Sequence, residues 1–129
     1  MLGQLLLLWA AAAAAGDAKP LHVELSDARN YVGKTINVTL IVRSASNSSE
    51  ALLILNSRLN PRDQENFAVV VLREDSQEFR QTDWDNLPAA VARFKDQKIN
   101  ATGKVRRRGK RYELIVRKRV QLTSFGNPS

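Results

Sequence analysis

A dense group of basic residues near the carboxyl end of the chain has the composition of an anion-binding site. The segment from Lys104 to Arg119 contains nine basic residues and one acid, Glu113. Guanidinium and ammonium groups bind phosphate and carboxylate oxygens through charge-assisted hydrogen bonds. Because concentrated like charges repel one another, a group of this density favours an anionic partner at this place.

The excess positive charge of the chain comes from this basic segment. The whole sequence has 20 Lys and Arg against 13 Asp and Glu. From residue 19 onward, the residues outside the segment balance at 11 basic and 11 acidic side chains. A polyanion such as nucleic acid or an acidic glycan is therefore the expected partner, and a solvated basic surface without a dedicated partner is the alternative.

Residue types that would support catalysis or metal binding are scarce. The chain has no cysteine and one histidine, His22, in an expected N-terminal tail, so a thiol nucleophile, disulfide bonds and most zinc sites are excluded. The carboxylate pairs Asp83 with Asp85 and Asp63 with Glu65 lack the companion ligands of two-metal chemistry. We interpret Asp83 and Asp85 as acids at a helix N-terminus. We therefore expect no enzyme, no catalytic residues, no cofactor and no metal.

Aromatic side chains that could stack on bases are few. Proteins that bind single strands combine cationic grooves with aromatic platforms. Tyr112 and Phe67 are the candidate platforms, although each could instead be a core residue, and helical spacing favours the core for Trp84 and Phe94. We therefore expect binding that is dominated by phosphate contacts, sensitive to salt and weakly selective for sequence.

The hydrophobic pattern indicates the elements that must position these residues. Apolar and polar residues that alternate, or a buried apolar run, predict strands, and a spacing of three and four predicts a helix. The expected order is one or two helical turns at 25–33, strands at 35–43, 51–55 and 67–72, a helix at 84–94, and a hairpin of strands at 98–105 and 112–116. A flexible Ser- and Asn-rich loop is expected at 44–49. The fold class is therefore all-β with one short helix, a five-stranded OB-fold barrel of the order β-β-β-α-β-β.

The basic hairpin is expected at the ligand-binding face of this barrel. In the OB-fold, the loop between the last two strands lies beside the loop between the first two at that face. The predicted nucleic-acid or polyanion site consists of Arg43, Lys104, Arg106, Arg107, Arg108, Lys110, Arg111 and Tyr112. Because side chains at a hairpin tip bury little apolar surface, replacement of Arg106, Arg107 and Arg108 with Ala is expected to weaken binding and leave the fold intact.

Several segments of the chain also resemble a known family. They are Tyr31 to Val38, Leu53 to Asn56, Asn66 to Val70, Asp96 to Val105 and Glu113 to Val116, which together span about 100 residues. They resemble small exported bacterial OB-fold proteins related to nucleic-acid-binding domains of the tRNA-anticodon-binding type. The resemblance implies the OB-fold and, as an expectation, nucleic-acid binding.

The N-terminal segment indicates export. Residues 2–15 have no charge, and an apolar run from Leu5 to Ala15 is followed by small residues. This pattern is typical of a signal peptide at about 1–18, with an uncleaved anchor as the alternative. We expect an N-terminal tail at 19–24, the OB-fold domain at 25–123 and a C-terminal tail at 124–129. The expected product is a secreted or periplasmic bacterial protein, monomeric and without a membrane span after cleavage.

These observations favour a binding function over catalysis. We expect an exported, non-enzymatic OB-fold protein that binds nucleic acid or another polyanion. The alternative is a cell-envelope module that binds a protein or an acidic glycan. A phosphodiester hydrolase is a third class, for which the sequence offers no motif.

Overall fold

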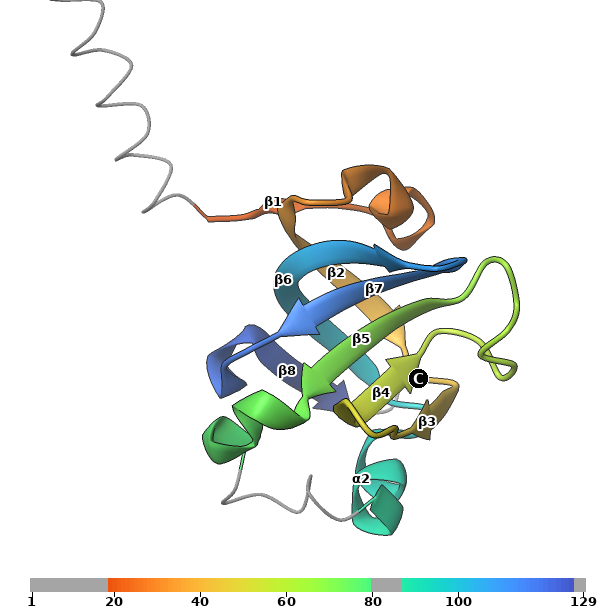
Figure 1. Ribbon diagram of the computed structural model, residues 1–129, viewed down its shortest axis with the longest axis vertical. Coiled ribbons are helices and arrows are strands. Elements are labelled where there is room, and N and C mark those ends of the chain that lie inside the picture. Colours follow the sequence, from red (N-terminus) through yellow and green to blue (C-terminus); the bar gives the residue numbers. More distant parts are fainter. Residues whose placement is uncertain (1–18, 80–86, 127–129) are drawn as a thin grey trace, which may run out of the picture.

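The computed structural model describes residues 19–79 and 87–126, which form a strongly twisted sheet with short helices around it (Figure 1). The strands are β1 (Leu21–His22), β2 (Thr35–Ile41), β3 (Ser44–Ser46), β4 (Ala51–Asn56), β5 (Phe67–Leu72), β6 (Lys98–Arg108), β7 (Arg111–Val116) and β8 (Leu122–Gly126). The helix α2 (Leu87–Phe94) and the 3-10 helices η1 (Leu25–Tyr31), η2 (Arg73–Phe79) and η4 (Arg119–Gln121) complete the described elements.

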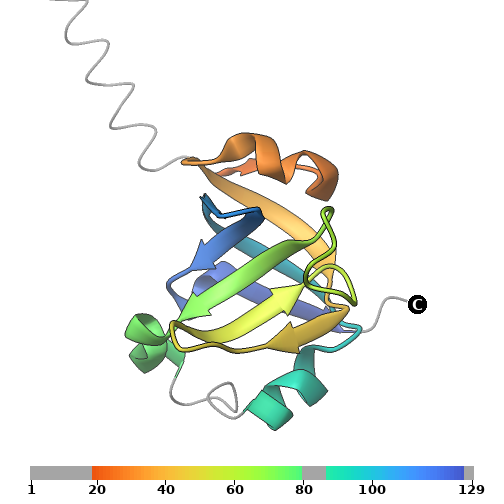
Figure 2. The same ribbon diagram turned by 45° about the vertical axis from the view of Figure 1, so that its right-hand side comes forward.

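The strands follow the order of an OB-like barrel. Neighbours in the sheet are β1-β2-β6-β7-β5-β4-β3, and β8 pairs with β6. The pair β5 and β7 is parallel, as is the short β1 with β2, and the other pairs are antiparallel. Two residues join β2 to β3: Val42 N donates to the Gln97 oxygen and Arg43 N donates to the Asn56 oxygen. This link brings β3, at one end of the path, back to β2, which is next to the other end, without a continuous closed ladder (Figure 2).

Strand formation follows the burial pattern of the sequence. Along β2 buried residues alternate with more exposed ones, and the same alternation continues in the first part of β6, as expected of strands with one buried face. Every residue of β4 and β5 is buried. Their inward side chains join the main core, and their outward side chains belong to a second, smaller apolar cluster. The central part of the sheet is therefore covered on both sides.

Two helices cover opposite ends of the barrel. The helix α2, between β5 and β6 in the chain, packs against β3 and β4 and places Phe94 in the main core. At the other end, η1 packs against β2, β5 and β6 through the fully buried Ala28. Figure 1 shows η1 above the strands and α2 below them. The end covered by η1 is also the end where the β6–β7 hairpin turns.

A glycine fixes the curvature of β6 just before the hairpin. An ideal Cβ at Gly103 would lie 2.0 Å from the Ile115 backbone oxygen. Only a residue without a side chain permits this close approach of β6 to β7. At the turn, Gly109 has a φ of 62°, a conformation that glycine adopts at low cost.

The all-β fold with one short helix, predicted from the sequence, is confirmed. The strands expected at 35–43, 51–55 and 67–72 correspond to β2, β4 and β5, and the expected hairpin corresponds to longer strands β6 and β7. The front of the predicted helix, with Asp83 and Asp85, lies outside the described residues.

The sheet also differs from the prediction at its margins. The first half of the expected 44–49 loop forms β3. The barrel was expected at 25–123, but β1 pairs with β2 before it and β8 continues to Gly126 after it. His22 therefore lies on a strand, where its Nδ1 is 2.7 Å from Asn37 Oδ1, instead of in a tail.

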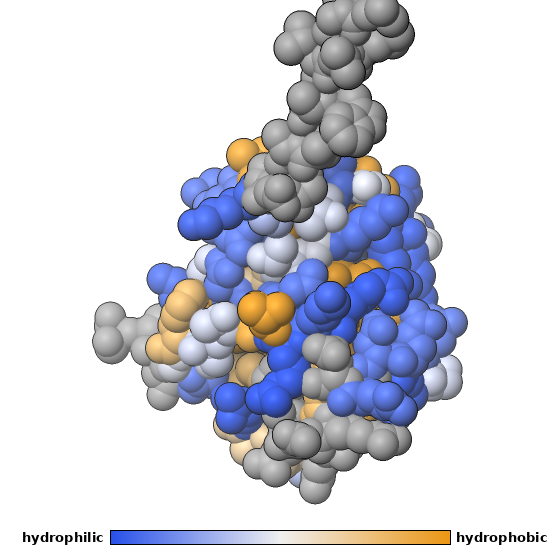
Figure 3. Space-filling view, turned by 90° about the vertical axis from the view of Figure 1, so that its left-hand side faces the viewer, coloured by the Kyte–Doolittle hydropathy of each residue, from blue (hydrophilic) through white to orange (hydrophobic). Residues whose placement is uncertain are grey.

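The face of the molecule seen in Figure 3 is mostly hydrophilic. Figure 3 shows one face on which apolar side chains form small, separate groups among polar ones. In residues 19–79 and 87–126, no helix has the length and hydrophobicity required to cross a membrane.

Candidate nucleic-acid interface

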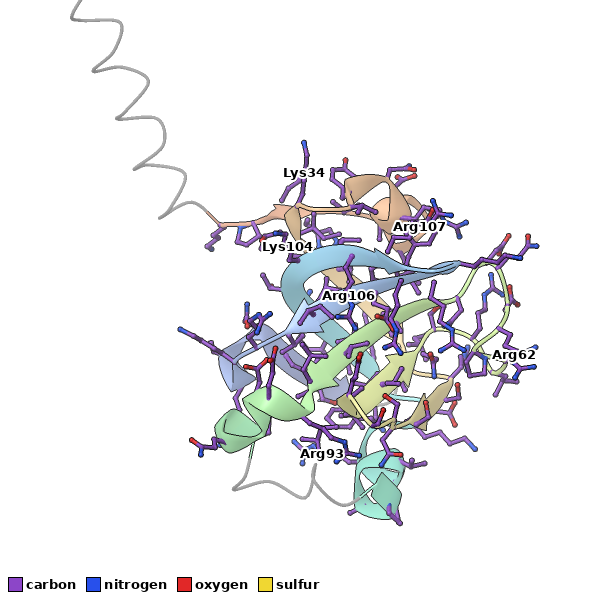
Figure 4. All side chains as sticks on the ribbon, in the orientation of Figure 1. Lys34, Arg62, Arg93, Lys104, Arg106 and Arg107 are labelled. Carbon is purple, nitrogen blue, oxygen red and sulfur yellow. The ribbon has the colours of Figure 1, made fainter. Side chains whose placement is uncertain are left out.

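The basic residues of the β6–β7 hairpin lie on two sides of the strands. Successive side chains of a strand point to opposite faces. Lys104, Arg106 and Arg108 therefore point to the outside of the barrel, whereas Arg107 shares its side with the buried Val105. Figure 4 shows Arg106 over β7 and Arg107 on the side of the hairpin toward η1. The predicted single site is thus divided by the pleat of β6.

On the outer side, two arginines are already paired with carboxylates. Arg106 Nε donates to Glu113 Oε1 at 2.9 Å, and the Glu113 side chain is only 3% exposed. Arg106 Nη2 is buried and has no hydrogen-bond partner among the described residues. Arg108 Nη1 lies 3.3 Å from Glu50 Oε2, which connects the hairpin to the loop before β4. The expectation that Arg106 could be removed without cost is therefore revised, because Glu113 would remain buried and unpaired.

Beneath these pairs lies an apolar floor. The second apolar cluster consists of Ala51, Ile54, Ala68, Val70, Leu72 and Ile115, from β4, β5 and β7. The outer face of the corresponding strands binds oligonucleotides in many OB-folds. Here this cluster contains no aromatic residue. The two salt bridges at its margin leave less free positive charge than the sequence suggested.

A basic pocket, here called the tip pocket, lies at the turn of the hairpin: Arg107 and Tyr112 line it from the side toward η1, and Lys110 and Arg111 line it from the turn itself. Its volume is about 600 Å³. It is lined by Pro61, Arg62, Asp63, Gln64, Asn66, Arg107, Lys110, Arg111 and Tyr112. Within the described residues, no carboxylate lies at ion-pair distance from its four cations. The tip pocket therefore offers guanidinium and ammonium groups that are available to an anion.

The pocket forms because β5 and β7 are parallel. Phe67 pairs with Tyr112 at the start of both strands, so the loop that leads into β5 lies beside the hairpin turn that leads into β7 (Figure 1). A turn at the loop tip is held by hydrogen bonds from Arg62 N to Asn60 Oδ1 and from Glu65 N to Asp63 Oδ1, each 2.9 Å. Arg62 thereby reaches the hairpin from a distant part of the sequence.

Tyr112 connects the tip pocket to the core. Its ring is half-buried and packs against the main core. The guanidinium carbons of Arg29 and Arg107 lie 5.9 and 5.7 Å from the ring centroid, within the range of cation–π attraction. Tyr112 therefore takes part in core packing, and its role as a stacking platform stays a prediction. Phe67, by contrast, is 3% exposed and belongs to the main core, so the prediction of Phe67 as a platform for base stacking is wrong.

Arg43 lies in a different pocket, here called the groove pocket. It has a volume of about 910 Å³ and is lined by Leu25, Ser26, Arg29, Thr39, Leu40, Ile41, Arg43, Ser57, Arg58, Glu65 and Lys98. None of these residues comes from 104–112. Arg43 Nη1 lies 3.6 Å from Asp96 Oδ1, and Arg58 pairs with Glu65. Arg43 thus shares its pocket with three other cations and not with the hairpin.

Sequence reasoning did not include Arg29 and Arg62. Arg29 belongs to η1 and Arg62 to the loop between β4 and β5, and neither is near the basic segment in the sequence. The parallel pairing of the third and fifth barrel strands could have pointed to both residues, because it places the segments that contain Arg29 and Arg62 at the same end of the barrel as the hairpin turn. Among the described residues, no group of three His, Asp or Glu side chains is placed to hold a metal ion.

Comparisons with known proteins support the fold. No protein-family model matches the chain, and no curated protein sequence matches it. Among solved structures, the chain is similar to one assigned as an aspartyl-tRNA synthetase from Leishmania major Friedlin, with a TM-score of 0.51 and 12% sequence identity. The alignment covers 85% of this chain and 21% of that one, so the chain spans about a fifth of the length of that protein. A likeness at this identity shows the OB-like fold alone.

Proposed function

We propose that this protein binds single-stranded nucleic acid without catalysing a reaction, and that the tip pocket is the principal contact. The observation that supports the proposal most directly is that Arg62, Arg107, Lys110 and Arg111 converge on one pocket beside Tyr112. The similarity to a structure assigned as a tRNA synthetase, although it concerns the fold, is compatible with this class of ligand.

Charge and shape both favour a phosphate backbone as the ligand. Four cations face one acid of the same pocket, Asp63, which itself accepts a hydrogen bond from Glu65 N. Phosphates bound there would release condensed counterions, which makes the affinity depend strongly on salt. A base could stack against the exposed part of Tyr112 or on the Arg107 guanidinium. These contacts discriminate poorly among bases, so weak sequence selectivity follows.

The proposal includes export. The uncharged apolar run before residue 19 supports a signal peptide and a secreted or periplasmic location. The residues available for chemistry support a binding role, because one histidine and no cysteine leave few options for nucleophilic catalysis.

The test is the salt dependence of binding to a fluorescein-labelled oligothymidylate, measured by fluorescence anisotropy. Each phosphate neutralised contributes about 0.7 to the log–log slope, so four cations give a slope near −3. Replacement of Arg107, Lys110 and Arg111 with Ala should flatten the slope by roughly two units. An unchanged slope would overturn the proposal.

A matched control removes the same charge from elsewhere. Lys34, Lys118 and Arg119 are exposed and have no ion pair with any carboxylate of the described residues. Their replacement with Ala should change the slope by less than about half a unit, because long-range attraction is screened within ~10 Å. If this triple variant lost as much as the tip variant, the binding would depend on net charge and not on the pocket. A polyuronate added as competitor distinguishes an acidic glycan, which would displace the oligonucleotide at equal charge concentration.

A further inference from the structure

We propose that the tip pocket and the groove pocket are two halves of one track, along which a single strand runs from the hairpin turn past η1 to the start of β6. This inference rests on the proposed function and adds the path and the length of the ligand. It places the strand away from the outer face of β4 and β5.

Stacked side chains connect the two pockets. Arg29 lines the groove pocket, and its guanidinium lies over the ring of Tyr112, which lines the tip pocket. Arg107 lies over the same ring and also lines the tip pocket. The two pockets therefore meet at three side chains that can each stack on a base or contact a phosphate.

The loop between β4 and β5 is a second connection, since it lines both pockets. Its two ends, Ser57, Arg58 and Glu65, face the groove pocket, and its tip, residues 61–64, faces the tip pocket. Asn66 holds this arrangement: its Oδ1 accepts from Arg58 N at 3.1 Å and its Nδ2 donates to Asn56 Oδ1 at 3.0 Å. A strand that follows the loop would pass from one pocket to the other.

The groove pocket has the charge that this path requires. Arg29 and Lys98 have no carboxylate at ion-pair distance within residues 19–79 and 87–126. Arg43 and Asp96 form an exposed pair, with side chains 49% and 58% accessible. Exposed pairs of this kind contribute little to stability, so Arg43 can exchange Asp96 for a phosphate at small cost.

The outer face is less suited to the same ligand. Arg106 is bound to the buried Glu113, and Arg108 is paired with Glu50 across the apolar floor. A phosphate at Arg106 would have to displace the carboxylate of a buried pair, which is costly. The Arg108–Glu50 pair is as exposed as the Arg43–Asp96 pair, so on this face Arg108 is the paired cation that a phosphate could reach at small cost. The tip and groove pockets together offer six cations without a carboxylate at ion-pair distance among the described residues, and this difference favours the track.

The experiment compares short and long strands on a groove variant. Oligothymidylates of about four and about twelve nucleotides span the usual site sizes of one OB-fold. Replacement of Arg43 and Lys98 with Ala should flatten the salt slope for the long strand by about 1.4 units, from two phosphates at ~0.7 each, and leave the short strand unchanged. The Lys118 and Arg119 double Ala variant, with equal charge loss, should affect neither strand. Urea denaturation checks that both variants are folded.

The outcomes distinguish this inference from the proposed function. If the groove variant binds the long strand with the wild-type slope while the tip variant is impaired, the track is wrong and the tip site stands. If the groove variant binds short and long strands with equally reduced affinity, the effect comes from the overall electrostatic field of the protein, and the track is also wrong. If Arg108→Ala flattens the slope for the long strand instead, the strand crosses the outer face. If neither oligonucleotide binds the wild-type protein, the proposed function is wrong, and the track that rests on it is wrong as well.

Discussion

On the outer side of the β6–β7 hairpin, Arg106 and Arg108 each lie within ion-pair distance of a carboxylate. On the side toward η1, Arg107 donates to the Gly109 backbone oxygen and lies over Tyr112, and no carboxylate of the described residues pairs with it. These arginines are consecutive or nearly so in the sequence. Their electrostatic surroundings differ because the strand pleat sends neighbours to opposite faces.

The comparison teaches that a count of basic residues measures charge and not binding capacity. Glu113 is the one acid of the segment, and it neutralises Arg106, which lies directly opposite it across the two strands and points to the same face. The structural task of Arg106 is to accompany a buried carboxylate. Arg107, its neighbour in the sequence, has no carboxylate partner among the described residues, which is why we propose it as a ligand contact.

Gly103→Ala should have the largest effect, because it disturbs both sides of the hairpin at once. The added Cβ would collide with the Ile115 backbone oxygen, and this collision can be relieved only if β6 moves away from β7. We expect the free energy of unfolding in urea to fall by about 3 kcal/mol, the upper end of overpacking costs. Gly109→Asn is the control: its site has a φ of 62° and open space, and Asn tolerates that conformation. Equal stability of the two variants would contradict the close approach.

Arg106→Ala should destabilise the fold more than Arg108→Ala. Loss of one partner from a fully buried pair costs ~3–5 kcal/mol, and because the Arg106 side chain is 33% exposed we expect about 2–3 kcal/mol. The Arg108–Glu50 pair is exposed on both sides, so its loss should cost under ~1 kcal/mol. Urea denaturation of both variants provides the comparison. Similar losses would mean that the burial of Glu113 does not distinguish the two pairs.

Tyr112→Leu tests the free side through binding. Leu retains apolar volume against the core but removes the ring that Arg29 and Arg107 contact. We expect affinity for an oligothymidylate to fall by about 1 kcal/mol, the lower end of base stacking, with an unchanged salt slope. Tyr112→Phe retains the ring and should bind like the wild type. A changed slope in the Leu variant would show that the substitution displaced the neighbouring cations.

Glu50→Gln should have the smallest effect and tests the paired side. The substitution releases Arg108 from its carboxylate partner without a change in side-chain volume. Because we place the ligand on the other side, we expect a salt slope within experimental error of the wild type and a stability change below ~0.5 kcal/mol. A slope steeper by about 0.7 would mean that the released arginine binds a phosphate, and that the outer face belongs to the site.

Much of the fold could be predicted because burial is recorded in the hydrophobic pattern. The alternation in β2 and the continuous apolar run of β5 gave their boundaries closely. The strands that the prediction missed, β1, β3 and β8, are short and mostly polar or exposed. They form because neighbouring strands present free backbone groups to them, which is a tertiary effect that no local pattern contains.

The positive charge of the candidate site could be predicted from the sequence. The way its cations are divided between the two sides of the hairpin and between the two pockets could not. The division between Arg106 and Arg107 requires the register of β6 with β7, and the pairing of Arg43 with Asp96 requires the bend between β2 and β3. Arg29 and Arg62 come from segments whose proximity depends on the whole barrel. Composition therefore leads to an expectation about the class of partner, whereas three-dimensional pairing determines which cations lack a carboxylate among the described residues.

Under the proposed function, the parallel pairing of β5 with β7 couples ligand binding to folding. Arg62 and Arg107 meet only when these strands are paired, so an unfolded chain has the same charges but no pocket. A ligand that binds only the folded state stabilises it by mass action, by ~2.7 kcal/mol at a hundred times its Kd. For a domain of this size, that corresponds to a rise in Tm of roughly 10 °C. Under the proposed function, an abundant single strand would therefore lower the unfolded fraction of the protein and, with it, the rate of its degradation.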